Sequence, residues 1–142
     1  MKVRETIIQL LKYGLVGASN TLLTAFVIFL CEHILGLKLM LADTIGYVVG
    51  IINSFIWNKT WVFKSHNHKL TAEIALFIGG FLICFAIQFI TVLLLRNPMK
   101  ALQISIFDFS PDAVGEYLAV GIGMVVYTIA NFFYNRCLTF RR

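Results

Sequence analysis

Charged residues are scarce in this sequence. Asp, Glu, Lys and Arg together make up 13% of its 142 residues, whereas 59% of the residues are hydrophobic. A soluble domain of this size covers its apolar core with charged side chains, and this chain has too few of them to do so. The mean hydropathy of +0.84 points the same way. The scarcity excludes an ordinary soluble domain and predicts an integral membrane protein whose surface is covered by lipid.

Groups that perform catalysis or bind metals are also scarce. Within the long apolar runs there is no His, Asp or Glu except the marginal Asp43, so the sequence sets up no acid/base pair and no metal cluster there. It also lacks a P-loop and a G-x-S-x-G motif. The three cysteines include no C-x-x-C pair, which disfavours a disulfide framework. We therefore expect a protein that is not an enzyme and that binds no cofactor and no metal.

Four apolar runs are long enough to cross a membrane. About 20 apolar residues in a helix span roughly 30 Å of hydrocarbon, so these runs predict an all-α membrane protein with a single transmembrane domain over residues 1–142. The predicted helices cover residues of about 13–31, 39–58, 74–95 and 117–135. The second run is the weakest, because it reaches this length only if Asp43 lies among the lipid headgroups.

Basic residues lie mostly on one side of the predicted helices. Nine of the twelve Lys and Arg residues fall in the N-terminal tail, the middle loop and the C-terminal tail. Because Lys and Arg are retained on the cytoplasmic side during insertion, this asymmetry predicts that both termini are cytoplasmic. Segments 32–43 and 96–116 would then be outer loops, the second with a stretch at 101–107 that is apolar enough to lie in the interface. The net charge of +5 follows from this membrane topology, and we expect no nucleic-acid binding.

The second and fourth predicted helices resemble each other at an offset of 77 residues. Gly46 corresponds to Gly123, and segment 58–64 (NKTWVFK) aligns without a gap with segment 135–141 (NRCLTFR). Apolar matches between membrane helices are common, but an Asn-basic pair followed at the same distance by a Phe-basic pair is not. We infer an internal repeat. The two halves would be parallel helical hairpins related by an axis near the membrane normal.

Several asparagines lie within the predicted helices or at their inner ends: Asn20, Asn53, Asn58, Asn131 and Asn135. An amide without a partner is costly in hydrocarbon, so these side chains need hydrogen bonds. Bonding between helices would satisfy any one of them. Their concentration in the inner half of the membrane instead indicates a polar pocket open to the cytoplasm, and the sequence leaves both interpretations open.

Three cations lie near the inner boundary of the predicted helices, namely Lys12, Lys59 and Arg136. No acidic residue adjoins them in sequence, and a phosphate group would suit them, because Arg binds phosphate oxygens bidentately and Lys acts as a point charge. The alternative is that they only reach lipid headgroups. Trp57 and Trp61, near the same boundary, are typical of an aromatic belt first and of sugar stacking second.

Three motifs resemble those of the GtrA-like family of small four-helix bacterial membrane proteins. They are KYGLVGASNT at 12–21, the segment from Gly46 to NKTWVF at 58–63, and NRCLTF at 135–140. The resemblance covers nearly the whole chain. It departs from the family in the long outer loop at 96–116, which therefore has no family-based interpretation.

The resemblance implies a role in the synthesis of cell-surface polysaccharide, in the bacterial inner membrane. Members of the family are thought to move polyprenyl-phosphate-linked monosaccharides across that membrane. We hypothesise that Lys59 and Arg136, with Lys12, bind the phosphate, and that the asparagines bind sugar or phosphate oxygens. We expect that two chains, as a homodimer, would line a fuller pathway. The rival hypothesis is a scaffold that recruits a glycosyltransferase and transports nothing, and a proton-coupled exporter ranks lowest because no ionisable residue lies deep in a predicted helix.

Overall fold

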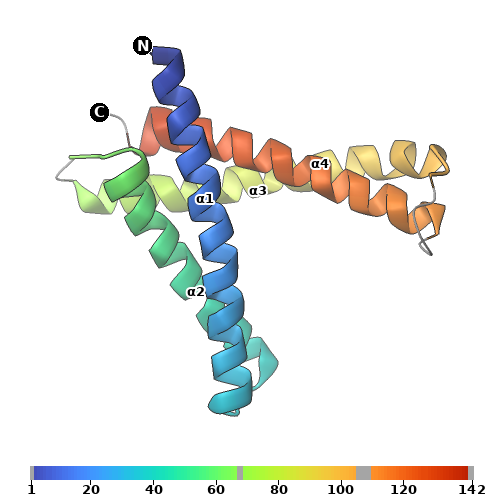
Figure 1. The fold of residues 1–142 in the computed structure, drawn as a ribbon, viewed down its shortest axis with the longest axis horizontal. Coiled ribbons are helices and arrows are strands. Elements are labelled where there is room, and N and C mark those ends of the chain that lie inside the picture. The colour runs from blue at the N-terminus through green and yellow to red at the C-terminus, as the bar shows by residue number, and fades with distance from the viewer. Residues whose placement is uncertain (1, 67–68, 105–109, 141–142) are drawn as a thin grey trace. The chain divides into compact units, whose positions relative to one another are not determined.

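The computed structural model describes residues 2–66, 69–104 and 110–140. Within them the chain forms four helices (Figure 1): α1 (Lys2–Phe29), α2 (Leu39–Trp57), α3 (Leu70–Ala101) and α4 (Pro111–Tyr134). Three of the helices continue into a wider π-helical turn: η1 (Leu30–Ile34), η2 (Asn58–Val62) and η3 (Asn135–Thr139). The described residues contain no strand. The prediction of an all-α chain is confirmed.

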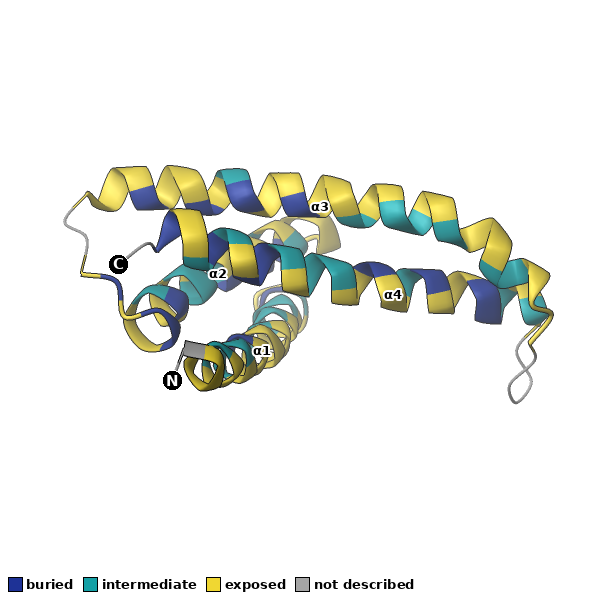
Figure 2. Ribbon diagram, turned by 90° about the horizontal axis from the view of Figure 1, so that it is seen from above, coloured by how far each residue is buried: buried dark blue, intermediate teal, exposed yellow. Residues whose placement is uncertain are grey.

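All four helices are long and apolar enough to cross a membrane. Including the π-helical turns, the spans are Val3–Ile34, Leu39–Val62, Leu70–Ala101 and Pro111–Thr139. In the most apolar stretch of each span only 11–22% of the residues are buried, and Figure 2 shows exposed residues along every helix. Apolar surface of this extent needs lipid around it. The chain is a multi-pass membrane protein, as predicted.

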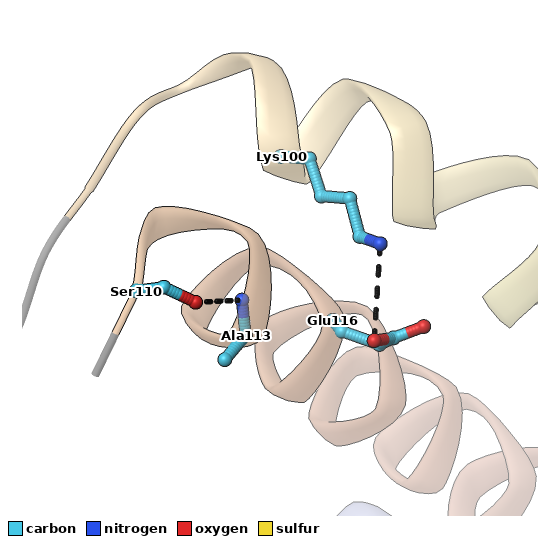
Figure 3. Close-up of polar contacts among 4 residues, drawn as sticks. All are labelled: Lys100, Ser110, Ala113 and Glu116. Atoms are coloured by element: carbon cyan, nitrogen blue, oxygen red, sulfur yellow. Dashed lines mark hydrogen bonds and ion pairs between the residues drawn. The ribbon is translucent and has the colours of Figure 1, made fainter.

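The predicted outer loop at 96–116 is helical at both ends. α3 continues through Pro98, which lies in its last turn, and α4 already begins at Pro111. Ser110 caps α4, because its Oγ accepts an amide N–H of the first turn at 3.3 Å (Figure 3). Proline suits the first helical position, where its missing N–H is not needed. Residues 105–107 of the predicted interfacial stretch lie outside the described residues.

The chain divides into two compact units, the first containing α1 and α2 and the second containing α3 and α4. In the first unit, Gly46 of α2 lies against Ile28 in the last turn of α1. At the other end, Tyr13 and Phe63 pack with ring centroids 6.1 Å apart. Contacts between the end of one helix and the beginning of the next make this unit an antiparallel helix pair. The parallel arrangement of two hairpins and the cytoplasmic termini stay predictions.

Glycine allows the helices of each unit to approach closely. A Cβ added at Gly46 would lie 2.5 Å from Ile28 Cγ1, and one added at Gly123 would lie 2.7 Å from Val92 Cγ2. At Gly115, a Cβ would lie 2.6 Å from the backbone nitrogen of Lys100. Small residues at such crossings are typical of membrane helices, whose association depends on close van der Waals packing.

The contacts of the first unit recur in the second. Tyr13 packs against Phe63, and Phe77 packs against Phe140, in both cases with ring centroids 6.1 Å apart. The first members of these pairs are 64 residues apart in sequence and the second members are 77 apart. The same two offsets relate the contact of Gly46 with Ile28 to the contact of Gly123 with Val92. Equivalent contacts at constant offsets are structural support for the internal repeat.

The turns η2 and η3 end the two units in the same way. Phe63 N–H donates to the carbonyl of Asn58 at 2.9 Å, and Phe140 N–H donates to the carbonyl of Asn135 at 2.8 Å. Both phenylalanines are buried. A π-helical turn is rare and is frequent at functional sites, so the two asparagines and the cations that follow them are the natural starting point for a site.

Candidate functional site

A groove lies between the two helices of the first unit. It has a volume of about 390 Å³ and is lined by Leu15, Val16 and Ser19 of α1, Trp57 of α2 and Trp61 of η2. The α1 residues share one face, because positions three and four apart in a helix are neighbours. The two tryptophans, also four apart, form the facing wall. The volume is in the range of small-molecule sites.

Lys12 provides a positive charge beside this groove. Its Nζ lies over the Trp61 ring, 5.0 Å from the ring centroid, and Trp61 meets Trp57 edge to face with centroids 6.0 Å apart. The negative face of an indole attracts a cation, so the contact holds the ammonium group next to the groove. The groove therefore combines apolar walls, the Ser19 hydroxyl and a cation.

The equivalent place in the second unit is occupied by a tyrosine ring. At the offsets of the repeat, Tyr134 corresponds to Trp57 and Gly80 corresponds to Val16. The Tyr134 ring lies so close to Gly80 that a Cβ added there would overlap it. In the first unit Val16 carries the side chain that Gly80 lacks, so the aromatic ring opposite cannot pack in the same way. The groove thus depends on the pairing of Val16 with Trp57.

Asn20 and Asn53 satisfy each other. Asn53 Nδ2 donates to Asn20 Oδ1 at 3.1 Å, which links α2 to α1. Gly50, one turn earlier on α2, lets the helices approach here, since a Cβ at that position would lie 2.5 Å from Thr24 Oγ1. Of the two interpretations left open by the sequence, hydrogen bonding between helices holds for this pair.

Asn131 and Asn135 belong to a ladder of polar side chains on one face of α4 and η3. Asn135 Nδ2 donates to Asn131 Oδ1 at 3.0 Å, and Asn131 Nδ2 donates to the Tyr127 hydroxyl at 3.2 Å. Beyond them, Asn135 Oδ1 and Thr139 Oγ1 are buried with no hydrogen-bond partner in the part of the chain that the structure describes. Sequence reasoning missed Thr139, although its spacing of four from Asn135 was an available signal.

Asn58 makes a similar ladder in the first unit. Its Nδ2 donates to Ser54 Oγ at 3.2 Å, while its Oδ1 is buried and has no hydrogen-bond partner among residues 2–66, 69–104 and 110–140. Val62 stands where the second unit has Thr139. A buried acceptor is costly when it has no donor. Each unit thus holds an amide oxygen that a hydroxyl group or a water molecule could satisfy.

Lys59 and Arg136 directly follow these asparagines. They lie in η2 and η3, and both side chains are half-buried. Each of these two predicted phosphate-binding cations thus follows, in sequence, a predicted site asparagine that is buried in the structure. The third, Lys12, lies at the groove of the first unit. Their binding of phosphate stays a prediction.

A buried acid at the start of α3 was missed by sequence reasoning. Glu73 is 1% exposed and begins a buried face that continues with Phe77, Gly80 and Cys84. Its counterpart in α1 is Gln9, whose Oε1 is also buried. The spacing of four between Glu73 and Phe77 was the available signal, but the apolar run begins only after Glu73. In the described segments, no group of three His, Cys, Asp or Glu side chains could hold a metal ion.

Comparison with known proteins places this chain in a family. A model of the family described as GtrA/DPMS, transmembrane domain, matches residues 12–140. The chain is 30% identical over 105 residues to the uncharacterized membrane protein YngA of Bacillus subtilis, covering 72% of this chain and 69% of that protein. It is 26% identical over 94 residues to the cell wall teichoic acid glycosylation protein GtcA of Listeria innocua, covering 64% of this chain and 65% of that protein.

The GtcA protein of Listeria monocytogenes is 24% identical over 94 residues, with the same coverage. The match thus spans slightly less than two thirds of the length of the GtcA proteins. The family match, in contrast, extends from Lys12 beside the groove to Phe140 after η3. The chain therefore belongs to the GtrA/DPMS transmembrane-domain family, as the resemblance of its motifs predicted.

Proposed function

We propose that this protein takes part in the glycosylation of a cell-surface polysaccharide by moving polyprenyl-phosphate-linked monosaccharides across the bacterial inner membrane. The observation that carries the proposal is the groove of the first unit, where apolar walls lie beside the Lys12 ammonium. Such a combination suits a lipid with an apolar tail and a phosphate. Two relatives named as cell wall teichoic acid glycosylation proteins support the part in glycosylation.

In this proposal the phosphate is received by Lys12, Lys59 and Arg136 at the inner leaflet. Arg can bind two phosphate oxygens at once, and Lys contributes a mobile point charge. Because the phosphate of this lipid is a diester and carries one negative charge, its passage through an apolar medium requires cations close to the path. The prenyl tail needs no enclosure, since it can remain in the bilayer while the headgroup moves.

Sugar hydroxyls are the donors proposed for the buried amide oxygens. Asn58 Oδ1 and Asn135 Oδ1 are buried acceptors in η2 and η3, and Asn131 orients Asn135 through their hydrogen bond. Asn20 and Asn53 receive a different role from the one first hypothesised. Because they bond to each other, we propose that they hold α1 against α2 beside the groove and act as positioning residues.

The test is transfer of a labelled polyprenyl-phosphate sugar in proteoliposomes that contain the purified protein. We expect Lys59→Ala and Arg136→Ala each to slow transfer by about tenfold, the size expected for losing one hydrogen bond to a charged group. Lys38→Ala is the matched control. That lysine is exposed at the N-cap of α2, so its removal changes the net charge equally and should leave the rate unchanged.

Three outcomes decide between the hypotheses. Unchanged rates for both Lys59→Ala and Arg136→Ala would overturn the assignment of these residues. Loss of rate in the Lys38→Ala control would show a general charge effect and would overturn it as well. Absence of transfer by the unmodified protein, together with co-purification of a glycosyltransferase, would favour the rival scaffold and end the transport proposal.

A further inference from the structure

The groove of the first unit is poorly suited to the sugar part of such a lipid. A sugar binds through several hydrogen bonds, and of the side chains lining this groove only Ser19 carries a hydroxyl. Leu15 and Val16 are purely apolar, and the two tryptophans present mostly ring surface. The buried amide oxygens of Asn58 and Asn135 are not among the atoms of the lining side chains. The groove is therefore better suited to an apolar occupant than to a sugar.

We propose that the groove binds the isoprene units next to the phosphate of a polyprenyl phosphate, with the phosphate itself beside Lys12. This inference rests on the proposed function and assigns the binding site of the lipid part of its substrate. The lining residues on α1 lie between Lys12 and Ser19, a rise of about 10 Å along the helix, which is room for roughly two isoprene units. The more distant part of the chain stays in the bilayer.

The walls favour an isoprenoid over a saturated acyl chain. The Trp57 and Trp61 rings meet edge to face, with an interplanar angle of 81°, and both line the groove. A trisubstituted double bond is flat and carries a methyl branch, so it makes a broad contact with an aromatic face. The Lys12 ammonium over Trp61 adds the charge that an anionic headgroup requires. The groove is thus complementary to a lipid that is branched and unsaturated near its phosphate.

The second unit shows that the fold by itself does not impose this groove. There the Tyr134 ring packs directly on Gly80, although the helix contacts on either side are equivalent. The pair Val16 and Trp57 keeps the corresponding space open in the first unit. A groove that depends on two side chains, with a cation at its edge, has the properties of a binding site.

The intrinsic fluorescence of the protein is a direct probe of the groove. The sequence contains only two tryptophans, and both line it. We would titrate a polyprenyl phosphate that carries no sugar into the purified full-length protein in detergent and record the tryptophan emission. The expected result is a saturable change, with an apparent Kd about tenfold weaker for Lys12→Gln, as for the loss of one charge-assisted contact. Lys38→Gln, the matched control, should bind as the unmodified protein does.

Further probes separate the sources of the signal. A polyprenol without phosphate should bind to the unmodified protein at least about tenfold more weakly than polyprenyl phosphate does. The Ser19→Leu variant, in which the larger side chain fills the groove, should bind polyprenyl phosphate at least about tenfold more weakly than the unmodified protein does. Phosphatidylglycerol at the same content in the micelle, and inorganic phosphate, should give no saturable response. The proposal would be overturned if phosphatidylglycerol or inorganic phosphate changed the tryptophan emission as polyprenyl phosphate does. It would also be overturned if the Lys12→Gln protein bound polyprenyl phosphate as tightly as the unmodified protein.

The failure of this inference can be told apart from the failure of the proposed function. If sugar-free polyprenyl phosphate binds as expected but no transfer occurs in proteoliposomes, the lipid site stands and transport is rejected. If transfer occurs but Lys12→Gln and Ser19→Leu change neither the fluorescence titration nor the rate, the groove is rejected as the lipid site and transport stands.

Discussion

The two helix pairs share their helix contacts but differ in the side chains between and beside the helices. At three equivalent positions the first pair has Lys12, Trp57 and Trp61, whereas the second has Leu76, Tyr134 and Leu138. The first pair consequently has a groove with a cation at its edge. In the second pair, the ring of the tyrosine packs on Gly80. The repeat has kept the contacts that set the helix spacing and has changed the chemistry around them.

The polar ladders also differ, and here the second pair has the additional polar side chains. In the second pair, Asn131 supports Asn135 and Thr139 adds another buried oxygen, whereas the first pair has Ser54 and Val62 at the positions equivalent to Asn131 and Thr139. Within the ladders, the second pair thus has one more such oxygen than the first, whereas Gln9 Oε1 of α1 brings the first pair to two as well among the described residues.

The largest expected effect lies where the end of α3 meets the beginning of α4. Gly115→Ala should lower the free energy of unfolding by about 2–3 kcal/mol, because the added methyl group collides with the backbone of Met99 and Lys100, which cannot move aside as a flexible side chain can. Thermal unfolding in detergent measures the loss. Gly121→Ala is the control, since nothing lies within 4 Å of a Cβ there. Equal unfolding temperatures for the two variants would contradict the close approach.

The ion pair at the same end of α3 and α4 should matter much less. Lys100 Nζ and Glu116 Oε2 are 3.8 Å apart (Figure 3), and both side chains are substantially exposed. Exposed pairs of this kind contribute little to stability. The close backbone contact of Gly115 is therefore the feature that joins the ends of α3 and α4.

An intermediate effect is expected when the first pair is given the second pair's packing. The double variant Val16→Gly with Trp57→Tyr should close the groove, because the smaller aromatic ring can then lie on the glycine as Tyr134 lies on Gly80. We expect transfer in proteoliposomes to fall on the order of tenfold, as for the lost burial of about two methylene groups. The response of the remaining tryptophan to polyprenyl phosphate should fall with it.

The reciprocal double variant, Gly80→Val with Tyr134→Trp, is the control for this exchange. It changes the same residue types in the other pair and leaves the groove intact, so the fluorescence response to polyprenyl phosphate should be kept. A groove that still binds the lipid after Val16→Gly with Trp57→Tyr would refute the explanation based on side-chain packing.

The smallest expected effect concerns the additional oxygen of the second pair. Thr139→Val removes a buried hydroxyl that has no partner in the described ranges and copies Val62 of the first pair. Stability should stay constant or rise by up to about 1 kcal/mol, because desolvation of an unpaired hydroxyl is unfavourable. Transfer should slow by about fivefold if that hydroxyl meets the sugar. Val62→Thr, the converse change, should destabilise the first pair, and a marked loss of stability in Thr139→Val would contradict the lack of a partner.

Much of the fold was predictable because hydropathy and helical length are local properties. The four spans and the repeat follow from the sequence, including the Asn-basic pairs that now begin η2 and η3. The helix ends were less predictable. α3 continues to Ala101, past Arg96 where the apolar run stops, because backbone hydrogen bonds can continue a helix into the polar interface, whereas an apolar run marks only the part in hydrocarbon.

The candidate site was predictable only in part. The sequence pointed to the cations and to the asparagines, but it left open which amides bond to each other. The structure pairs Asn20 with Asn53 across two helices and reveals buried Glu73 and Thr139, which lie at the margins of apolar runs. Whether such a side chain is buried depends on the helix packed against it, and the hydropathy along the chain does not show which helix that is.

The sequence by itself determined that this chain lies in a membrane as helices and that its two halves are repeats. Partition into lipid is a sum over neighbouring residues, so it can be read along the chain. Only the tertiary structure decided that Tyr134 packs on Gly80 in one pair and that a groove is lined by Val16 and Trp57 in the other. That difference depends on whether Val16 or Gly80 faces the aromatic ring of the neighbouring helix, and side-chain packing between helices far apart in sequence has no local signature.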